Sequence, residues 1–293
     1  MLNRLERIQV AVRDGGAAAK RWRALFGADL YDEYHLDLHN AAVTSLRLGE
    51  SAVDLLEPAG PGTTADHLER WGEGIFGVGF TTRDITGLAA HLADAGAVVV
   101  EAGGRLYIEP DQTKGMRVVL TPAYRQPPAG ALRYIYEVTN IVDDHVEAAN
   151  FYADLFGLDA SRFSPIASDR YGYRGALTLF DPPERLDRIE LTQTHDPEQP
   201  MGRFYGRRGQ SIYMCFAECD DMEALAARFD EHGVRWQPDK DHWGAEPESG
   251  DALNNLYVHP SSLNGVLMGI SRTTFAWTWS GRPDLVRPAG STR

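Results

Sequence analysis

The order of apolar and polar positions along the chain repeats four times. In each copy an alternating run leads to an aspartate, and a run with apolar residues at three- and four-residue spacing follows and ends at a glycine. The alternating run predicts a strand, and the second run predicts a helix. The copies have their reference positions at Arg7, Gly77, Glu137 and Met214, their aspartates at Asp14, Asp84, Asp144 and Asp221, and their glycines at Gly27, Gly96, Gly157 and Gly233.

The residues at the two ends of each predicted helix fit helix capping. A carboxylate before the first turn accepts hydrogen bonds from free backbone N–H groups, and glycine adopts the left-handed conformation that ends a helix. Short strand-like runs follow each helix, such as NAAVTSLRLG and SAVDLLEP in the first copy. The repeat therefore predicts an α+β fold of four βαβββ modules in two pairs.

The chain is long enough for two domains, and a segment with proline and glycine separates the two pairs of modules. We predict an N-terminal scaffold domain at 1–123, a linker at 124–132, a C-terminal domain with the active or binding site at 133–272, and a tail at 273–293. The tail carries aromatic residues at alternating positions, so we expect one face of it to dock on the protein or on a partner subunit. These aromatic residues are Phe275, Trp277 and Trp279.

Composition narrows the functional classes. The 293 residues are 43% hydrophobic and carry a net charge of -13, which argues against nucleic acid and anionic membranes as partners. The two cysteines, Cys215 and Cys219, lack the second pair of a zinc site, and the chain has no 18-residue apolar run or signal peptide. We expect a cytoplasmic protein with buried, reduced thiols.

The phrases FYADLFGL, AVDLLEP and LYVHPSSLNGVLMG resemble the vicinal oxygen chelate superfamily of glyoxalases, epimerases, bleomycin-resistance proteins and extradiol dioxygenases. The resemblance covers about residues 4 to 272. It implies that the four βαβββ modules form two half-open barrels, each a pair of modules around one divalent metal that is held by the first and last strands of each module. It also implies a small-molecule substrate or ligand and a homo-oligomer.

In the first barrel, the residues at the positions implied as metal ligands do not suit a metal. They are Arg7, Asp54, Gly77 and Val119. Arginine cannot bind a cation, and glycine and valine have no donor atom. We expect Arg7 and Asp54 to form an ion pair there.

In the second barrel, the corresponding residues are Glu137, Glu190, Met214 and Gly269. Two carboxylates without imidazole make a poor transition-metal site, so we expect no metal cofactor, with a weakly held divalent metal at Glu137 and Glu190 as the alternative. Neither acid has an imidazole or a metal to neutralise it. We therefore expect them to face each other and share a proton, as a general acid and base; hydrogen bonding to backbone or tyrosine is the structural alternative.

Tyr257 matches the position of a catalytic tyrosine in extradiol dioxygenases, so the predicted catalytic residues are Glu137, Glu190 and Tyr257. His259 shares the strand of Tyr257, although it could instead cap the following turn. The polar segment before that strand contributes His242 and Trp243. Arg207 lies in an arginine-rich extra loop, which could bind an anionic group or be solvated. The predicted substrate-binding residues are Met214, His259, His242, Trp243, Arg207 and Phe216.

Three functions remain open. The first is a metal-independent lyase or isomerase that acts by carboxylate acid–base chemistry on a small oxygenated, aromatic metabolite. The second is a non-catalytic binding protein of the bleomycin-resistance type. The third is an extradiol-type ring-cleaving dioxygenase with unusual ligands.

Overall fold

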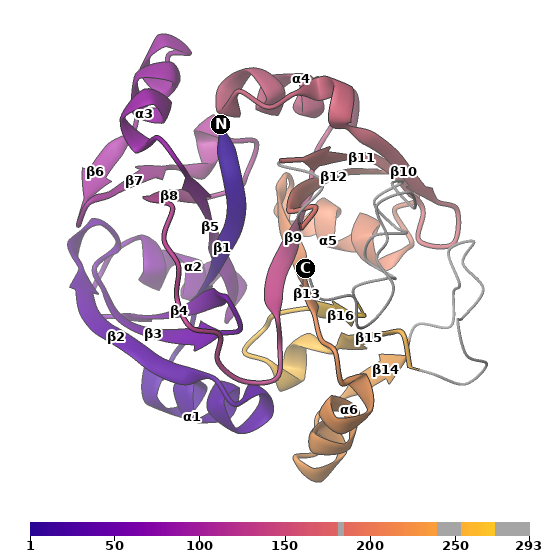
Figure 1. Cartoon of the computed structure of the whole chain (residues 1–293). Helices are drawn as coiled ribbons and strands as arrows, with labels where there is room; N and C mark the ends of the chain where they lie inside the picture. Colours follow the sequence, from indigo (N-terminus) through magenta and orange to yellow (C-terminus); the bar gives the residue numbers. More distant parts are fainter. Residues whose placement is uncertain (181–184, 239–252, 273–293) are drawn as a thin grey trace. The chain divides into compact units, whose positions relative to one another are not determined.

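The computed structural model describes residues 1–180, 185–238 and 253–272. The predicted tail at 273–293, with its three aromatic residues, and the candidates His242 and Trp243 lie outside these residues. Within the described chain, sixteen strands form two eight-stranded sheets, one from each pair of modules (Figure 1). The predicted α+β fold of four βαβββ modules is confirmed.

The first sheet has the strand order β2-β3-β4-β1-β5-β8-β7-β6. The first strands of the two modules are neighbours at its centre, and each pairs in parallel with the last strand of its own module. The elements of this half are β1 (Leu2–Ala11), α1 (Gly15–Phe26), β2 (Asp29–Leu36), β3 (Ala41–Leu48), β4 (Ser51–Pro58), α2 (Thr63–Trp71), β5 (Gly74–Thr82), α3 (Ile85–Asp94), β6 (Val100–Ala102), β7 (Arg105–Ile108) and β8 (Val118–Pro122).

The second sheet repeats this arrangement, with the order β10-β11-β12-β9-β13-β16-β15-β14. Its elements are β9 (Tyr134–Ile141), α4 (His145–Phe156), β10 (Ser164–Ser168), β11 (Tyr173–Leu179), β12 (Arg188–Thr194), α5 (Pro200–Arg208), β13 (Ser211–Glu218), α6 (Met222–Glu231), β14 (Trp236–Pro238), β15 (Asn255–Val258) and β16 (Met268–Ser271). None of the described helices has both the length and the apolar character needed to cross a membrane.

The aspartate caps of all four repeated helices and the glycine caps of α1 and α4 are those that the sequence predicts, whereas the cap residues of α3 and α6 are Ala95 and His232, one position before the predicted glycines. Each of the four aspartates accepts a hydrogen bond from a backbone N–H group of the first helical turn. Gly27 and Gly157 end α1 and α4 in the left-handed conformation, with φ values of 68° and 58°. The chemistry of these caps is local, which is why it is visible in the sequence.

Two helices were not predicted. The segment expected to be an arginine-rich loop contains α5, and the equivalent place after β4 contains α2. The glycines and the proline of α5 hide the helix, although proline is favoured at the first position of a helix. Gly202 is required there because a Cβ atom at this position would lie 2.0 Å from the carbonyl oxygen of Asp196.

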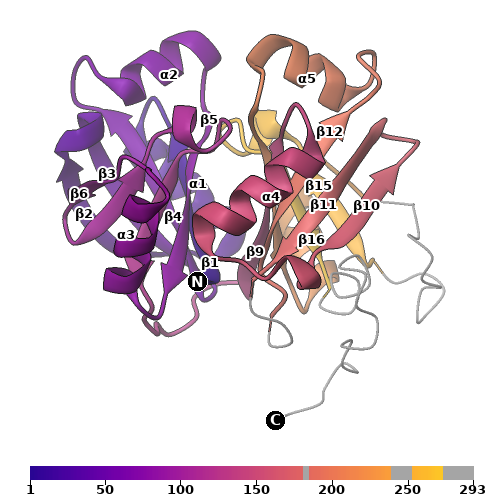
Figure 2. The same ribbon diagram turned by 90° about the horizontal axis from the view of Figure 1, so that it is seen from above.

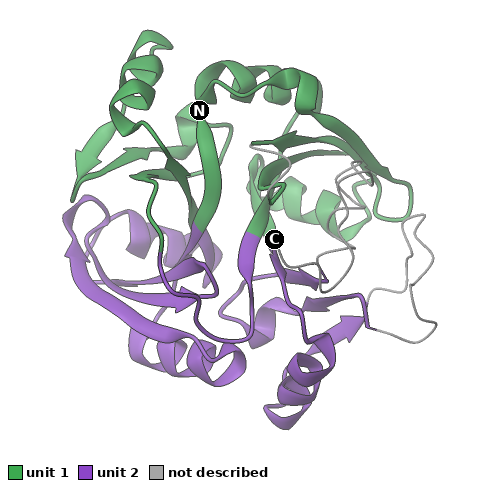
Figure 3. Cartoon of the chain, in the orientation of Figure 1, with its two compact units in different colours: residues 1–6, 77–125, 136–214 green, residues 7–76, 126–135, 215–293 purple. Residues whose placement is uncertain are grey.

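By compactness the chain divides into two units that each take modules from both sheets, shown in different colours in Figure 3. One unit contains residues 1–6, 77–125 and 136–214, and the other contains 7–76, 126–135 and 215–293. In the first unit α3 and α4 lie side by side (Figure 2), and His91 of α3 contacts the carbonyl oxygen of Asp154 at 2.7 Å. In the second unit, Phe26 of α1 packs edge-on against Phe229 of α6.

The predicted linker is held against the first module. Gly49 and Ala129 form an isolated antiparallel bridge, and the backbone N–H of Ala131 donates to Phe26 O at 2.7 Å. Gly130 has a φ of 80°, and a Cβ atom there would lie 2.2 Å from Phe26 O. The domain boundaries at 123 and 133 stay a prediction, because the sheets and the compact units divide the chain differently.

Candidate functional site

The register of β9 and β12 brings four polar side chains onto one face of the second sheet. In this parallel pair Glu137 is opposite Arg188, and Thr139 is opposite Glu190. Residues two apart on a strand share a face, and so do residues at the same register on neighbouring strands. All four residues belong to the same compact unit.

Glu137 forms a buried ion pair with Arg188. The Nε of the guanidinium donates to Glu137 Oε2, and the two side chains are 1% and 3% exposed. The guanidinium carbon also lies 4.8 Å from the centre of the Tyr136 ring. Burial opposes the charge on the guanidinium, but Glu137, Tyr136 and Glu190 outweigh it and raise the pKa of Arg188. The arginine therefore remains a resident positive charge.

Glu190 is the titratable member of the cluster. Burial first, and the negative charge of Glu137 second, raise the pKa of Glu190 well above its ordinary value. A hydrogen bond with Glu137 acts in the same direction. The Thr139 hydroxyl, which donates to Glu190 Oε2 at 2.7 Å, and the charge of Arg188 act against it. The two glutamates thus meet as predicted, and Glu190 holds its proton to higher pH.

Arg188 was missed by the sequence prediction, which considered only an imidazole or a metal as the group that could neutralise these acids. The guanidinium does so for Glu137. A signal was present in the sequence, because Arg188 is two residues before Glu190 and must share its face of the strand. The positions implied by the resemblance did not include it.

The first sheet contains a similar pair with the signs exchanged. Arg7 Nη1 lies 2.7 Å from Asp54 Oδ2, and the side chains are 1% and 0% exposed, which confirms the predicted ion pair. Asp54 also accepts from Ser45 Oγ at 2.7 Å and from Tyr34 OH at 3.4 Å. In the first sheet the cation is on the first strand of the module, whereas in the second sheet the cation is on the last strand.

An aromatic ring covers the backbone at the fourth implied ligand position. Phe216 on β13, Gly269 on β16 and Tyr257 on β15 share a register. A Cβ atom at Gly269 would lie 2.1 Å from Phe216 Cε1, so no side chain fits there unless the ring moves. The rings of Phe216 and Tyr257 are 5.9 Å apart in an edge-on arrangement, with Phe216 buried and Tyr257 half-buried.

The other predicted residues have varied positions. Met214 is buried on β13. His259 is exposed and caps the turn at Pro260, where its Nδ1 accepts from the backbone N–H of Ser261 at 3.1 Å, as in the alternative considered for it. Arg207 is exposed in the last turn of α5. Their roles in substrate binding stay predictions.

The residues at the implied metal position do not fit a divalent cation. Glu137 is already paired with a guanidinium, which would repel a second positive charge placed beside it. Met214 offers only a thioether, and Gly269 offers no side chain. Among the described residues, no three histidine, cysteine, aspartate or glutamate side chains come together.

Comparison with known proteins identifies the class. Residues 6–118 and 135–246 each match a family model of the Glyoxalase/Bleomycin resistance protein/Dioxygenase superfamily. Together these matches cover well over half of the chain, which belongs to this superfamily as a tandem member. The expected resemblance is confirmed.

Individual relatives are more distant. A 105-residue stretch is 31% identical to an ethylmalonyl-CoA/methylmalonyl-CoA epimerase of Cereibacter sphaeroides, covering 35% of this chain and 78% of that protein. A mutant 4-hydroxymandelate synthase from Streptomyces coelicolor is similar in structure, with a TM-score of 0.69, 16% identity and 93% of both chains covered. A xylose isomerase-like TIM barrel/4-hydroxyphenylpyruvate dioxygenase fusion protein gives a TM-score of 0.63 at 15% identity, over 93% of this chain and 49% of that one. These structural similarities show the shared fold.

Proposed function

We propose that this protein is a metal-independent isomerase or lyase that moves a proton at a carbon next to a carbonyl group of a small molecule. The observation that carries the proposal is Glu190, a buried carboxyl group whose pKa is raised by burial and by Glu137. A carboxyl group of this kind can accept and return a proton at a higher pH than an ordinary glutamate.

In the proposed reaction, the ionised carboxylate of Glu190 removes a proton from the carbon next to the carbonyl. The electron pair of the broken C–H bond forms an enolate. Protonation of the enolate carbon on its opposite face, by water or by Glu190 after the enolate has turned over, gives the epimer, and expulsion of a leaving group on the adjacent carbon gives an elimination product. The raised pKa makes the Glu190 carboxylate a stronger base once it is ionised, while Glu137 orients Arg188. The catalytic role of Tyr257, which belongs to the other compact unit, stays a prediction.

The 31% identical relative supports the isomerase form of the proposal. It is named an ethylmalonyl-CoA/methylmalonyl-CoA epimerase. Epimerisation next to a thioester carbonyl requires loss and return of one proton, which is the chemistry that a single poised carboxyl group can begin. We therefore propose acyl thioesters as the first substrates to test, ahead of the aromatic metabolites that the sequence suggested.

A second candidate is a binding protein without catalysis. The first sheet favours it, because Arg7 and Asp54 form a buried ion pair of the same type there. If buried pairs only close the sheets, the Glu137–Arg188 pair has a structural role and Glu190 contributes to ligand affinity alone.

The test is proton exchange in D₂O. Methylmalonyl-CoA and ethylmalonyl-CoA are incubated with the protein, and loss of the proton signal next to the carbonyl is followed by NMR. We expect exchange above the protein-free rate, and a reduction of about 10²- to 10⁴-fold in Glu190→Gln, the usual effect of removing a positioned acid–base group. The double variant R7M/D54L is the matched control, because it replaces a buried pair outside the site and should exchange like the wild type.

Equal exchange in the wild type and Glu190→Gln would remove Glu190 from the mechanism. Binding of a thioester without any exchange would favour the binding protein. The same assay run with Glu137→Gln separates the two glutamates, since this change removes the partner of Arg188 while leaving the Glu190 carboxyl group in place.

A further inference from the structure

One nitrogen of Arg188 has no partner in the described part of the chain. Nε donates to Glu137, and Nη1 makes a long contact of 3.4 Å with the carbonyl oxygen of Leu186. Nη2 is buried and makes no hydrogen bond. Because a buried N–H donor without an acceptor costs free energy, an orphaned nitrogen on a buried guanidinium indicates a missing acceptor.

The equivalent pair in the first sheet does not have this feature. Within the described residues, Arg7 leaves no buried nitrogen without a partner, and its acid accepts further hydrogen bonds from Ser45 and Tyr34. Both pairs are almost completely buried. Burial of an ion pair in this fold therefore does not by itself leave a guanidinium nitrogen without a partner, and of these two buried pairs only the Glu137–Arg188 pair has such a nitrogen.

The free donor belongs to the same cluster as the titratable carboxyl group. Arg188 and Glu190 are two residues apart on β12, so their side chains lie on the same face of the strand. The charge of Glu190 raises the pKa of Arg188, and the charge of Arg188 lowers the pKa of Glu190. Glu137 holds the guanidinium through Nε, which restricts its orientation without using Nη2. Arginine suits this role because its planar group can bind two acceptors at once.

We propose that Nη2 of Arg188 binds an anionic oxygen of the substrate, either a carboxylate or the enolate that forms when a proton leaves. This inference deepens the proposed function, on which it rests for the enolate step. Arg188 then supplies from the protein chain the positive charge that stabilises the oxyanion. In a buried setting such a preformed charge stabilises the developing anion strongly. The substrate class is a small molecule with a carboxylate or thioester carbonyl next to an acidic C–H bond.

Malonate, which carries two carboxylates on one carbon, is the probe, and malonamide is its neutral counterpart. Binding to the full chain is measured by calorimetry at constant ionic strength. We expect malonate to bind and malonamide not to bind. We expect affinity for malonate to fall by about tenfold or more in R188M/E137L, which removes the donor without leaving an unpaired buried charge.

Two further variants make the test specific. Arg188→Lys keeps the charge beside Glu137 but lacks the planar pair of donors, so weaker malonate binding is expected in a folded protein. R7M/D54L is the matched control and should bind malonate within about twofold of the wild type, because these two residues form a separate ion pair in the other compact unit. Failure of the wild type to bind malonate at about 10 mM, or equal affinity in R188M/E137L, would overturn the inference.

The outcome is separable from that of the proposed function. Loss of proton exchange in Glu190→Gln with Arg188-dependent malonate binding supports both. If malonate binding depends on Arg188 but neither the wild type nor any variant exchanges the substrate proton, the anion site is supported and the proposed enzymatic activity is refuted. Glu190-dependent exchange with malonate binding that ignores Arg188 keeps the enzyme and refutes the anion site.

Discussion

At the candidate site a single guanidinium is close to two carboxyl groups, and this gives the two acids different properties. Glu137 makes the direct contact with Arg188, whereas Glu190 is hydrogen bonded to Thr139 and to Glu137. Two adjacent carboxylates do not both ionise easily in a buried place, so the acid without the direct cation contact keeps its proton. Glu190 is therefore a titratable group beside the permanently charged guanidinium of Arg188.

Glu190 makes the stability of the protein depend on pH. Its pKa in the folded state is raised above the ordinary value of 4.5, so its contribution to stability is complete below about pH 4.5 and is lost as pH rises through the folded-state pKa. Glu190→Gln has no ionisable carboxyl group at this position, so this pH-dependent loss of stability should be absent from the variant. We expect the free energy of unfolding in urea, measured from pH 5 to 8, to fall less steeply with pH in the variant than in the wild type. Glu147→Gln, at an exposed position on α4, should follow the wild type. Parallel curves for the wild type and Glu190→Gln would contradict the raised pKa.

The Arg7–Asp54 pair allows a test of buried charge at a second position. Arg7→Met alone leaves the Asp54 carboxylate unpaired and should lower the free energy of unfolding by about 3 to 5 kcal/mol. The double variant R7M/D54L should lower the free energy of unfolding by less than either Arg7→Met or Asp54→Leu alone. As a control, Arg47→Met affects a pair with Asp29 that is 3.5 Å apart and partly exposed, and should cost about 0 to 1 kcal/mol. Urea unfolding of all four variants measures these costs. If R7M/D54L lost as much free energy of unfolding as the two single variants together, the two residues would not be coupled.

The sequence allowed only part of the site to be predicted. Glu137, Glu190 and the Arg7–Asp54 pair follow from positions within a repeat, which depend on local spacing. The partner of Glu137 depends on the register between β9 and β12, because a shift of two residues would place Glu190 opposite Glu137 in place of Arg188. Such a register is set by packing across the sheet, so sequence spacing alone does not give it.

At the scale of elements, helix ends were predicted more reliably than additional helices. The aspartate and glycine caps depend on a few neighbouring residues, and the structure has those of α1 and α4 at the predicted places. The helix α5 contains two residues that are unfavourable in a helix interior, Gly202 and Gly206. Its formation depends on packing against β12, which helix propensity does not show.

Gly269 gives a prediction about the packing of β13, β15 and β16. A methyl group at this position would overlap the Phe216 ring, so Gly269→Ala should lower the free energy of unfolding by about 1 to 3 kcal/mol. Phe216→Leu in the same protein removes the overlapping ring atoms and should recover part of the loss. Gly206→Ala is the matched control, because nothing lies within 4 Å of its added Cβ atom in α5, and it should be neutral or stabilising by about 0.4 to 1 kcal/mol. The free energy of unfolding in urea is compared for the wild type, Gly269→Ala, Gly269→Ala with Phe216→Leu, and Gly206→Ala. A Gly269→Ala variant as stable as the wild type would show that the Phe216 ring can move to make room for the methyl group.

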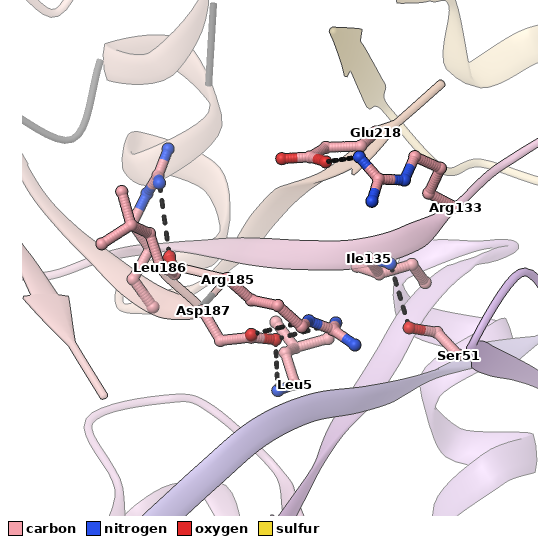
Figure 4. Close-up of polar contacts among 9 residues, drawn as sticks. Leu5, Ser51, Arg133, Ile135, Arg185, Leu186, Asp187 and Glu218 are labelled. Atoms are coloured by element: carbon pink, nitrogen blue, oxygen red, sulfur yellow. Dashed lines mark hydrogen bonds and ion pairs between the residues drawn. The ribbon is translucent and has the colours of Figure 1, made fainter. Parts of the chain in front are cut away.

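At the scale of the whole molecule, the repeat determines equivalent contacts in the two compact units. In one unit the backbone N–H of Leu5 donates to Asp187 Oδ1, and in the other the N–H of Ile135 donates to Ser51 Oγ, both at 2.9 Å (Figure 4). Leu5 and Ile135 each precede the reference residue of their module by two positions. The four modules could therefore be predicted from the sequence. The assignment of modules to compact units could not, because it depends on contacts between distant segments such as α3 with α4.

The last prediction concerns metal and the stability of the whole chain. A ligand that binds only the folded state raises its stability by mass action, so a bound metal should be visible in the melting temperature. Because the Arg188 guanidinium is paired with Glu137, we expect neither EDTA nor added Mn²⁺ to change the melting temperature or the proton-exchange activity of the wild type. Arg188→Ala removes the guanidinium and leaves two buried carboxyl groups, which Mn²⁺ could then neutralise. We therefore expect Mn²⁺ to raise the melting temperature of Arg188→Ala and not that of R7M/D54L, in which both charges of the first pair are absent. A fall in the melting temperature of the wild type with EDTA would show that metal binds in spite of Arg188, and the same Mn²⁺ response in all three proteins would place the metal elsewhere.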